Sequence, residues 1–461
     1  MSDEKLELKP FQVTGAKFLA TKRRACIYDD PGLGKTTQLI HATNWLEPKP
    51  RKILVLGSKS SLAVWMREYK KWAPDTPVKL ITASNKNVGM RSSLWRNAYN
   101  APGITLTNYD TWRIDFQKDE VPTEWDHITG DEAHQIQNRS TQRYKSLQLV
   151  ASKTNSLFWA TGSPMSRGPQ NIFTHLQTIA PRVFTSFWKF VSTWCEVTRT
   201  PYGTEIGPPR NVENFKRMLS NYAIQRLKSE VAPEVPLGFK SILPVEFAED
   251  LLGLYERLEV DAITELPNEN LVVNTNTLVQ LLHLRQFCIT PKLLSEELPY
   301  GPALEKVGEL LNECDDYHCV IFTPFAEALP IFKQFFVDVG VSPNSIFTLQ
   351  GGTHPNEVAH KIEQFTKTRG IMLCTIAFAQ SFEFLTPDKV FFIGFDWDPE
   401  KNKQAERRTE RLITRHVVNY YYVVCVGSVD EHVLETCVMK NINVSTVIKT
   451  ADDLRKIFYG Q

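Results

Sequence analysis

Short runs of β-branched and aromatic residues alternate with helical patterns in this chain, first between residues 24 and 160 and again between residues 319 and 426. Strands that alternate with helices form parallel sheets with helices on both faces. The strand-like runs are Arg24–Tyr28, Ile53–Leu56, Ile104–Thr107, Asp126–Thr129, Ser156–Trp159, Cys319–Phe322, Ile346–Leu349, Gly370–Cys374, Lys389–Ile393 and Tyr420–Val426. We therefore predict an α/β protein with two doubly wound parallel-sheet domains.

The segment between these two regions has a different pattern. From about Pro169 to Leu298 the strand signal is weak, and helical patterns are broken by proline and glycine. We predict a first α/β domain over 1–240 with a helical insertion at about 169–235, a linker and second helical insertion over 241–300, and a second α/β domain over 301–461 that ends in a helical tail. Ligands on such sheets bind at the carboxyl ends of the strands.

Composition and charge exclude several classes of protein. Apolar residues make up 42% of the chain, which is typical of a folded protein, and no apolar run approaches the roughly 18–20 residues of a membrane span. The charged N-terminus has no secretory pattern. With 53 Lys and Arg against 52 Asp and Glu, a polyanion would be bound in a local groove rather than by overall charge. We expect a cytoplasmic protein, bacterial or in the host cell of a virus, with no membrane contact.

Residues 29–38 follow one predicted strand and open a predicted helix with the sequence Asp-Asp-Pro-Gly-Leu-Gly-Lys-Thr-Thr-Gln. Gly32 and Gly34 permit a tight turn whose N–H groups point at phosphate, and the helix N-terminus adds its positive end. Lys35 would then reach the β- and γ-phosphates of ATP. Asp29 stands where the phosphate-loop consensus has glycine, so an ordinary strand-to-helix turn that contains glycine is the alternative.

Mg²⁺ and the attacking water need oxygen ligands and a base. The Thr36 hydroxyl, next to the lysine, is placed to bind Mg²⁺. The run Asp131–His134 follows a later predicted strand, where Asp131 can hold the metal and Glu132 can orient and deprotonate water. A solvated acidic turn is the alternative for such a pair, and the phosphate loop upstream makes it the less favoured one.

Arginines in the second half can complete an ATP site. Arg408 and Arg411 are three residues apart in the run Gln404–Arg411, so they would share one face of a helix. An arginine placed on a transferring phosphoryl group is worth about 10³–10⁵ in rate. A solvent-exposed basic helix is the alternative, and we expect Arg407 and Arg415 to be of that kind.

These motifs, in this order and over two lobes, resemble the superfamily 2 helicases and translocases, and within them the Swi/Snf-type DNA-dependent ATPases. The resemblance covers nearly the whole chain and implies two RecA-like domains, with Asp131–His134 as the DEAH box. It also rests on Leu8–Gly15, Ser60–Trp65, Thr107–Tyr109, Thr161–Pro164, Ile224–Val231, Leu284–Cys288 and Val320–Thr323. The segments at 224–231 and 284–288 are specific to the Swi/Snf branch.

The resemblance implies roles for further residues. Besides Lys35 and Thr36, the nucleotide contacts are Gln12, which would bind adenine, and Gly32, Gly34, Thr37 and Gln404. The residues that couple the ATP site to nucleic acid are His134, Thr161 and Ser163. The candidates for contacts with the DNA backbone are Ser60, Ser61, Thr107, Asn108, Thr323 and Thr375, although serine and threonine at strand ends are also common caps. The segment Thr375–Glu383 departs from the family pattern because it lacks the usual glycines.

The sequence thus predicts an ATP- and Mg²⁺-dependent DNA translocase. ATP would draw the two lobes together, because the lysine and the acids lie in one lobe and the arginines in the other. We expect a monomer that remodels duplex, forked or branched DNA by branch migration, fork reversal or annealing in replication, recombination or repair. A strand-separating DNA or RNA helicase, and an ATP-gated nucleic-acid clamp with little turnover, are the alternatives.

Overall fold

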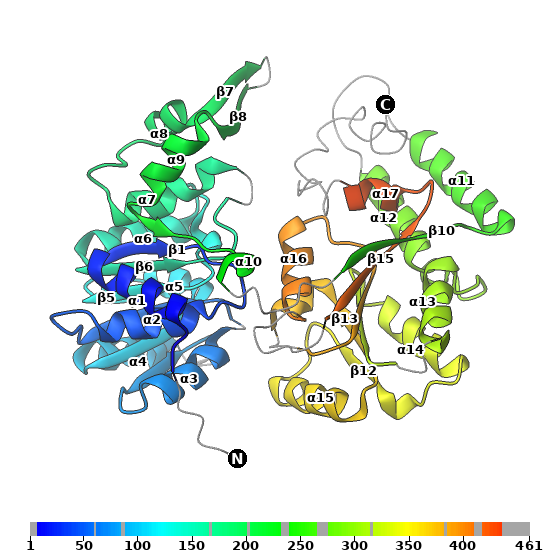
Figure 1. Cartoon of the computed structure of the whole chain (residues 1–461), viewed down its shortest axis with the longest axis horizontal. Coiled ribbons are helices and arrows are strands. Elements are labelled where there is room, and N and C mark those ends of the chain that lie inside the picture. The colour runs from blue at the N-terminus through cyan, green and yellow to red at the C-terminus, as the bar shows by residue number, and fades with distance from the viewer. Residues whose placement is uncertain are drawn as a thin grey trace. The chain divides into compact units, whose positions relative to one another are not determined.

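The chain divides into two units, Met1–Pro233 and Glu234–Gln461, each with its own parallel sheet in the computed structural model (Figure 1). The structure describes residues 7–59, 61–83, 88–165, 168–200, 203–231, 239–264, 275–313, 317–381, 385–409 and 417–435. The predicted α/β class with two doubly wound sheets is confirmed. The predicted helical tail lies outside the described residues.

The sheet of the first unit has seven parallel strands in the order β3-β4-β2-β5-β6-β1-β9. Their bounds are β1 (Arg24–Ile27), β2 (Lys52–Gly57), β3 (Val78–Ile81), β4 (Gly103–Asn108), β5 (His127–Gly130), β6 (Ser156–Ala160) and β9 (Ala223–Ile224). The five strands predicted from the sequence are all present. The other two, β3 and β9, lie at the edges of the sheet, where short and half-exposed strands carry little hydrophobic pattern.

Helices cover both faces of this sheet, and alternate strand residues enter two separate cores. Ile53 and Val55 of β2 pack with α1, α2 and α3, whereas Leu54 and Leu56 pack with α4 to α9. The helices are α1 (Pro10–Lys22), α2 (Lys35–Asn44), α3 (Ser61–Trp72), α4 (Val88–Asn100), α5 (Tyr109–Phe116), α6 (Gln142–Lys153), α7 (Phe173–Ile179), α8 (Phe187–Trp194), α9 (Val212–Leu219) and α10 (Lys228–Val231), with short 3₁₀ turns η1 (Ala133–Ile136) and η2 (Pro169–Ile172).

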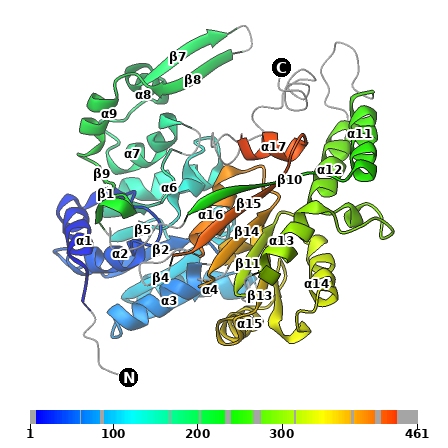
Figure 2. The same cartoon turned by 45° about the vertical axis from the view of Figure 1, so that its right-hand side comes forward.

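The predicted helical insertion also contains an antiparallel ribbon. Strands β7 (Cys195–Thr200) and β8 (Gly203–Pro209) pair only with each other, and they extend from α8 and α9 beyond the rest of the first unit (Figures 1 and 2). The sequence of this ribbon is polar and ends in two prolines, so it lacks the apolar alternation that identifies a strand. Its structure comes from the cross-strand ladder, which a local pattern does not reveal.

The sheet of the second unit has six parallel strands in the order β10-β15-β14-β11-β13-β12. Their bounds are β10 (Lys240–Val245), β11 (Cys319–Thr323), β12 (Ile346–Leu349), β13 (Ile371–Thr375), β14 (Lys389–Ile393) and β15 (Asn419–Cys425). The start of the predicted linker segment, at residues 241–245, is therefore a sheet strand. Its Pro244 weakens the strand signal, yet an edge strand such as β10 tolerates proline.

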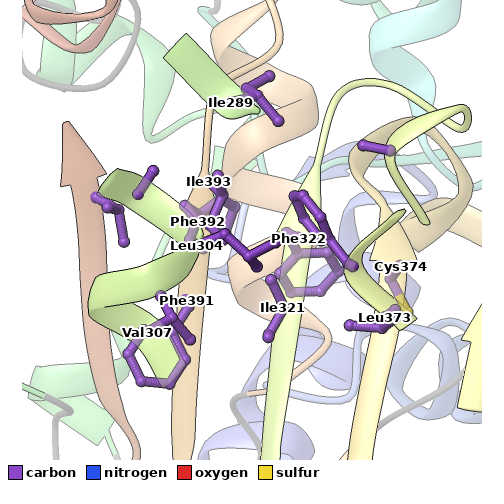
Figure 3. Close-up of a cluster of buried hydrophobic side chains, with 14 of the residues drawn as sticks. Ile289, Leu304, Val307, Ile321, Phe322, Leu373, Cys374, Phe391, Phe392 and Ile393 are labelled. Carbon is purple, nitrogen blue, oxygen red and sulfur yellow. The ribbon is translucent and has the colours of Figure 1, made fainter. Parts of the chain in front are cut away.

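Helices on both faces bury the second sheet in one continuous core (Figure 3). Side chains of the central strands, such as Ile321, Phe322 and Phe392, meet Leu304 and Val307 of α13 there. The elements are α11 (Glu249–Thr264), α12 (Thr275–Ile289), α13 (Pro302–Glu313), α14 (Ala328–Asp338), α15 (Pro355–Thr368), α16 (Pro399–Arg407) and α17 (Val429–Val433), with 3₁₀ turns η3 (Pro291–Leu293), η4 (Pro343–Ser345) and η5 (Ile376–Ser381). Among the described residues, none of these helices or those of the first unit combines the length and apolar character of a membrane span.

Candidate active site

The connections that follow five strands of the first unit carry residues predicted to bind ATP, to contact DNA or to couple the two. Because all strands of this sheet are parallel, the loops after β1, β2, β4, β5 and β6 leave the same edge. These loops bear Lys35, Ser61, Asn108, Asp131 and Thr161. The sheet topology therefore brings together motifs that are far apart in the sequence.

The loop between β1 and α2 has the geometry of an anion-binding turn. Gly32 and Gly34 have φ of 83° and 70°, and Gly34 caps α2 without a side-chain hydrogen bond to the first helical turn. A Cβ on Gly34 would lie 2.4 Å from Gln12 Nε2, and the φ of 70° is one that residues with a side chain rarely adopt. Lys35 Nζ donates to the carbonyl oxygens of Asp29 and Asp30 at 2.8 and 3.3 Å. The ammonium group and the N–H groups of α2 thus supply the donors that phosphate oxygens need.

Asp29, which replaces the consensus glycine, anchors this loop from inside the protein. Its carboxylate is fully buried and paired with the Arg226 guanidinium, whose Nε donates at 3.0 Å. Gln38 Nε2 donates to the same carboxylate at 3.1 Å, and Arg226 donates to Gln38 Oε1 at 2.7 Å. Gly15 of α1 makes room for this cluster, because a Cβ there would lie 1.9 Å from Gln38 Oε1. The departure from consensus is therefore an ionic support for the loop.

Gln12 also supports the loop. Its Oε1 accepts from the Lys9 N–H at 3.0 Å, and its Nε2 donates to the Leu33 carbonyl at 3.2 Å. The side chain thus joins the N-terminus of α1 to the phosphate loop. An adenine contact by Gln12 stays a prediction. Thr37, in the first turn of α2, donates to Glu68 Oε2 at 3.3 Å.

Asp131 has a buried carboxylate that accepts from two donors, and a third donor holds its main-chain carbonyl. Its Oδ2 accepts from Trp65 Nε1 at 3.0 Å, its Oδ1 accepts from the Glu132 N–H at 2.9 Å, and its carbonyl accepts from Tyr109 Oη at 2.8 Å. Burial and the adjacent Glu132 carboxylate raise the pKa of Asp131 to about 6, while the Trp65 hydrogen bond and the Lys35 charge act in the opposite direction. A buried carboxylate with this excess of negative charge is suited to a divalent cation.

Glu132 has a left-handed backbone, with φ of 49°. Such a conformation is unfavourable for glutamate and is found where surrounding structure imposes it, often at functional sites. Its Oε2 lies 3.2 Å from His134 Nδ1, which is 3.5 Å from Thr161 Oγ1. Thr161 Oγ1 accepts from the Ser163 N–H at 3.1 Å. The three residues predicted to couple the sites therefore form a chain that starts at the predicted base.

Two residues that support the candidate site were not predicted from the sequence. Gln137 Nε2 donates to the carbonyls of Ser163 and Pro164 at 3.1 and 2.8 Å, so it joins the loop after the acids to the loop after β6. His175 of α7 donates from Nε2 to the Ala133 carbonyl at 2.8 Å and accepts from Tyr28 Oη at 3.0 Å. Gln137 lies three residues after His134, and this position beside the acidic motif was the sequence signal that could have identified it. His175 lies in an ordinary helical pattern, which offers no such signal.

The residues present fit ATP and Mg²⁺. The phosphate loop offers main-chain and ammonium donors, and the half-buried Thr36 hydroxyl and the Asp131 carboxylate are the hard oxygen ligands that Mg²⁺ prefers. Within the described residues, Ser163 Oγ is buried and lacks a hydrogen-bond partner, which leaves a free polar atom at this edge.

Two of the predicted DNA-contact side chains already have internal hydrogen-bonding roles. Thr107 is buried and donates to the Ile81 carbonyl at 2.7 Å, and Asn108 caps α5 by accepting from the N–H groups of Asp110 and Thr111. Ser61 begins α3, half-buried. In the second unit, Thr323 and Thr375 are buried neighbours at the ends of β11 and β13. Ser60 lies outside the described residues.

The second unit holds the predicted arginine motif in and after α16. Gln404 is half-buried in this helix, and Arg408 follows its end, where the Arg408 carbonyl accepts from the Leu385 N–H at 2.9 Å. Arg407 pairs with Glu400 at 2.8 Å, consistent with a structural role. Arg411 and Arg415 lie outside the described residues.

The chain is similar to several known proteins. The family model described as SNF2-related domain matches residues 11–293, more than half of the 461 residues. The DNA annealing helicase and endonuclease ZRANB3 of Bos taurus is 24% identical over 92% of this chain and 39% of its own length. The SWI/SNF-related matrix-associated actin-dependent regulator of chromatin subfamily A-like protein 1 of Xenopus tropicalis is 23% identical over 93% of this chain and 44% of its own length.

The chain thus spans about two-fifths of the length of the curated relatives it matches. Among solved structures, the Hef helicase domain of Pyrococcus furiosus has the same fold, with a TM-score of 0.55 and 14% identity over 92% of this chain and 97% of that one.

Proposed function

Because the chain belongs to the SNF2-related domain family, a family of helicase-like ATPases, we propose that it translocates on duplex or branched DNA and remodels it at the expense of ATP. Family membership confirms the Swi/Snf-type resemblance of the motifs and the assignment as an ATPase. The remodelling reaction we propose is branch migration, fork reversal or strand annealing. One relative is named a DNA annealing helicase, which supports this choice.

The geometry of the first unit carries the proposal. Lys35 lies close enough to Asp131 for its charge to lower the pKa of that carboxyl, which supports one shared site for the proposed phosphate donors and the proposed metal ligand. We propose that Lys35 and the N–H groups at the start of α2 bind the β- and γ-phosphates, and that Gln12, Gly32, Gly34 and Thr37 shape the nucleotide pocket.

Hydrolysis then needs a held metal and a base. Thr36 and Asp131 would hold Mg²⁺, which when bound supplies positive charge to the phosphates. Glu132 accepts a proton from the attacking water, and its contact with His134 orients the carboxylate. The chain from His134 through Thr161 to Ser163 is our proposed link from this base to bound DNA.

We propose complementary roles for the arginines and for the residues that would contact DNA. Arg408 and Arg411 would stabilise negative charge on the transferring phosphoryl group, and Gln404 would contact the nucleotide. We propose that the DNA backbone is contacted by Ser60, Ser61, Thr323 and Thr375. Thr107 and Asn108 support the junction between β4 and α5. Contacts of this kind are independent of sequence and sensitive to salt. Since one chain carries both motif sets, we propose that it acts as a monomer.

The test is ATP turnover across a panel of nucleic acids, run beside a strand-displacement assay. We expect duplex, forked and four-way DNA to stimulate turnover more than single-stranded DNA or RNA, without extensive strand displacement. Lys35→Ala and Glu132→Gln should abolish turnover on every substrate, because one removes the phosphate ligand and the other the base.

Four outcomes would contradict the proposal. Strongest stimulation by single-stranded RNA would indicate an RNA helicase, and efficient strand displacement a separating helicase. Tight DNA binding with negligible turnover would indicate a clamp. Undiminished turnover in Lys35→Ala or Glu132→Gln would refute the site itself.

A further inference from the structure

Helix α3 makes a direct hydrogen bond to the proposed metal ligand. The Trp65 indole is fully buried, and its N–H donates to Asp131 Oδ2 at 3.0 Å. The other carboxylate oxygen accepts the Glu132 N–H at 2.9 Å. With one donor on each oxygen, the carboxylate plane is fixed, and its remaining lone pairs are the ones available to a cation. Trp65 therefore decides how Asp131 is oriented.

The same helix starts at a proposed DNA contact. Ser61 is the first residue of α3 and Trp65 follows four residues later, one helical turn and about 6 Å along the axis. Gly57 at the end of β2 lets α3 approach the sheet, because a Cβ there would lie 2.5 Å from Ser61 Oγ and 3.7 Å from Trp65 Cδ1. A displacement of the first residue of α3 is therefore transmitted to the Trp65 indole, because one rigid helical turn joins the two.

A second link joins α3 to the phosphate-binding helix. Glu68 Oε2 accepts from Thr37 Oγ1 in the first turn of α2 at 3.3 Å and from Trp72 Nε1 at 3.0 Å. Residues 61, 65, 68 and 72 follow the spacing of one helical face. The helices α2 and α3 lie side by side (Figures 1 and 2). One face of α3 therefore contacts both the metal ligand and the phosphate-binding helix.

We propose that α3 transmits DNA binding to the ATP site, with Trp65 as the positioning residue that sets Asp131 for Mg²⁺. This inference rests on the proposed DNA-stimulated ATPase. DNA bound at the start of α3 shifts the position of this helix. The Trp65 indole N–H then brings the Asp131 carboxylate into its metal-binding orientation. Partners of metal ligands that act in this way typically change metal affinity by about 10–100-fold when removed. Two properties should therefore depend on Trp65, the requirement for Mg²⁺ and the stimulation by DNA.

The chain provides a matched control for this hydrogen bond. Trp95 is likewise fully buried, and its N–H also donates to a buried carboxylate, Asp115 Oδ2, at 3.0 Å. Trp65→Phe and Trp95→Phe each remove one indole-to-carboxylate hydrogen bond and leave an aromatic ring. Both should lower stability to a similar degree, but only Trp65→Phe removes a bond to Asp131.

The experiment measures ATP turnover against Mg²⁺ concentration, with and without duplex DNA. It also measures, without turnover, the Mg²⁺ affinity of each protein bound to a non-hydrolysable ATP analogue, which Trp65→Phe should weaken by about 10-fold and Trp95→Phe should leave unchanged. Trp65→Phe should raise the Mg²⁺ concentration for half-maximal turnover by about 10-fold and reduce the fold-stimulation by DNA, whereas Trp95→Phe should leave both at wild-type values. Glu68→Ala, at a partly exposed site, breaks the link to α2 and the hydrogen bond with Trp72 but leaves the hydrogen bond between Trp65 and Asp131 in place. It should reduce stimulation and leave the Mg²⁺ requirement unchanged, which keeps the test decisive if Trp65→Phe does not fold.

The outcomes separate this inference from the proposed function. If wild-type protein shows no stimulation by DNA, the proposed function fails. If wild type is stimulated and Trp65→Phe matches Trp95→Phe in both readouts, the role of Trp65 is overturned. Undiminished stimulation in Glu68→Ala would overturn the role of α3 as the transmitting helix.

Discussion

Two fully buried histidines brace the first unit from inside. His127 of β5 contacts the hydroxyls of Ser156 at 2.9 Å and Thr129 at 2.7 Å, and burial lowers its pKa to about 3. His175 bridges Tyr28 and the Ala133 carbonyl next to the acidic motif, and burial lowers its pKa to about 4. Both imidazoles are therefore neutral at physiological pH and act as hydrogen-bonding spacers.

These depressed pKa values predict acid sensitivity. The unfolded chain protonates each histidine near pH 6.5, but the folded chain does so only near pH 3 or 4, so stability present above pH 6.5 is lost as the pH falls. We expect a loss of about 2 kcal/mol per histidine between pH 7.5 and 5. The raised pKa of Asp131 acts in the opposite direction below about pH 6, because protonation relieves its burial.

Urea denaturation of wild type and His127→Gln across this range measures the effect. The variant should be less stable at pH 7.5, yet its free energy of unfolding should fall by about 2 kcal/mol less on acidification. If the free energies of unfolding of the two proteins changed by the same amount with pH, His127 would not take up a proton on unfolding.

Among elements, the phosphate loop is held by an ionic cluster that joins four parts of the first unit. Arg226 follows β9, and it pairs with Asp29 after β1, donates to Gln38 of α2 and donates to the Phe11 carbonyl of α1. Arg226 is largely buried and Asp29 completely so. The proposed phosphate loop thus gets its shape from Arg226, a residue close to the end of the unit.

Removal of the Arg226 guanidinium should lower both the stability of the first unit and its affinity for ATP. Arg226→Ala leaves the Asp29 carboxylate buried without its cation, which typically costs about 3–5 kcal/mol. We expect a lower melting temperature and weaker ATP binding, measured by thermal unfolding and by nucleotide titration. The control is Lys306→Ala, which removes an exposed ion pair in the second unit and should change neither. Wild-type melting and affinity in Arg226→Ala would contradict the account of this loop.

Local sequence patterns were sufficient to predict the buried strands and the motifs that follow them. They were insufficient for the edge strands β3, β9 and β10, the last of which contains a proline, and for the β7–β8 ribbon, which is polar. The edge strand β12 was predicted. The sequence showed that Asp29 departs from the consensus, but its partner lies 197 residues away, and such a pairing depends on the folded sheet. Likewise Trp65 belonged to a recognised motif, while its bond to Asp131 required the structure.

At the scale of the whole molecule, the proposed chemistry is divided between the two units. Lys35, Asp131 and Glu132 belong to the first unit, whereas Gln404 and Arg408 belong to the second. Each unit has its own sheet and core, so each set of side chains is positioned independently of the other. We therefore propose that catalysis depends on ATP and DNA bringing the two sets together, as a cycle of closing and opening would require.

The most direct measurement is the turnover number for ATP of Arg408→Ala and Arg411→Ala at saturating ATP and duplex DNA, with ATP affinity measured on the same samples. If guanidinium groups of the second unit stabilise the transferring phosphoryl group bound by the first, turnover should fall by about 10³-fold or more while ATP affinity changes far less. Turnover close to wild type in both variants would contradict the divided site.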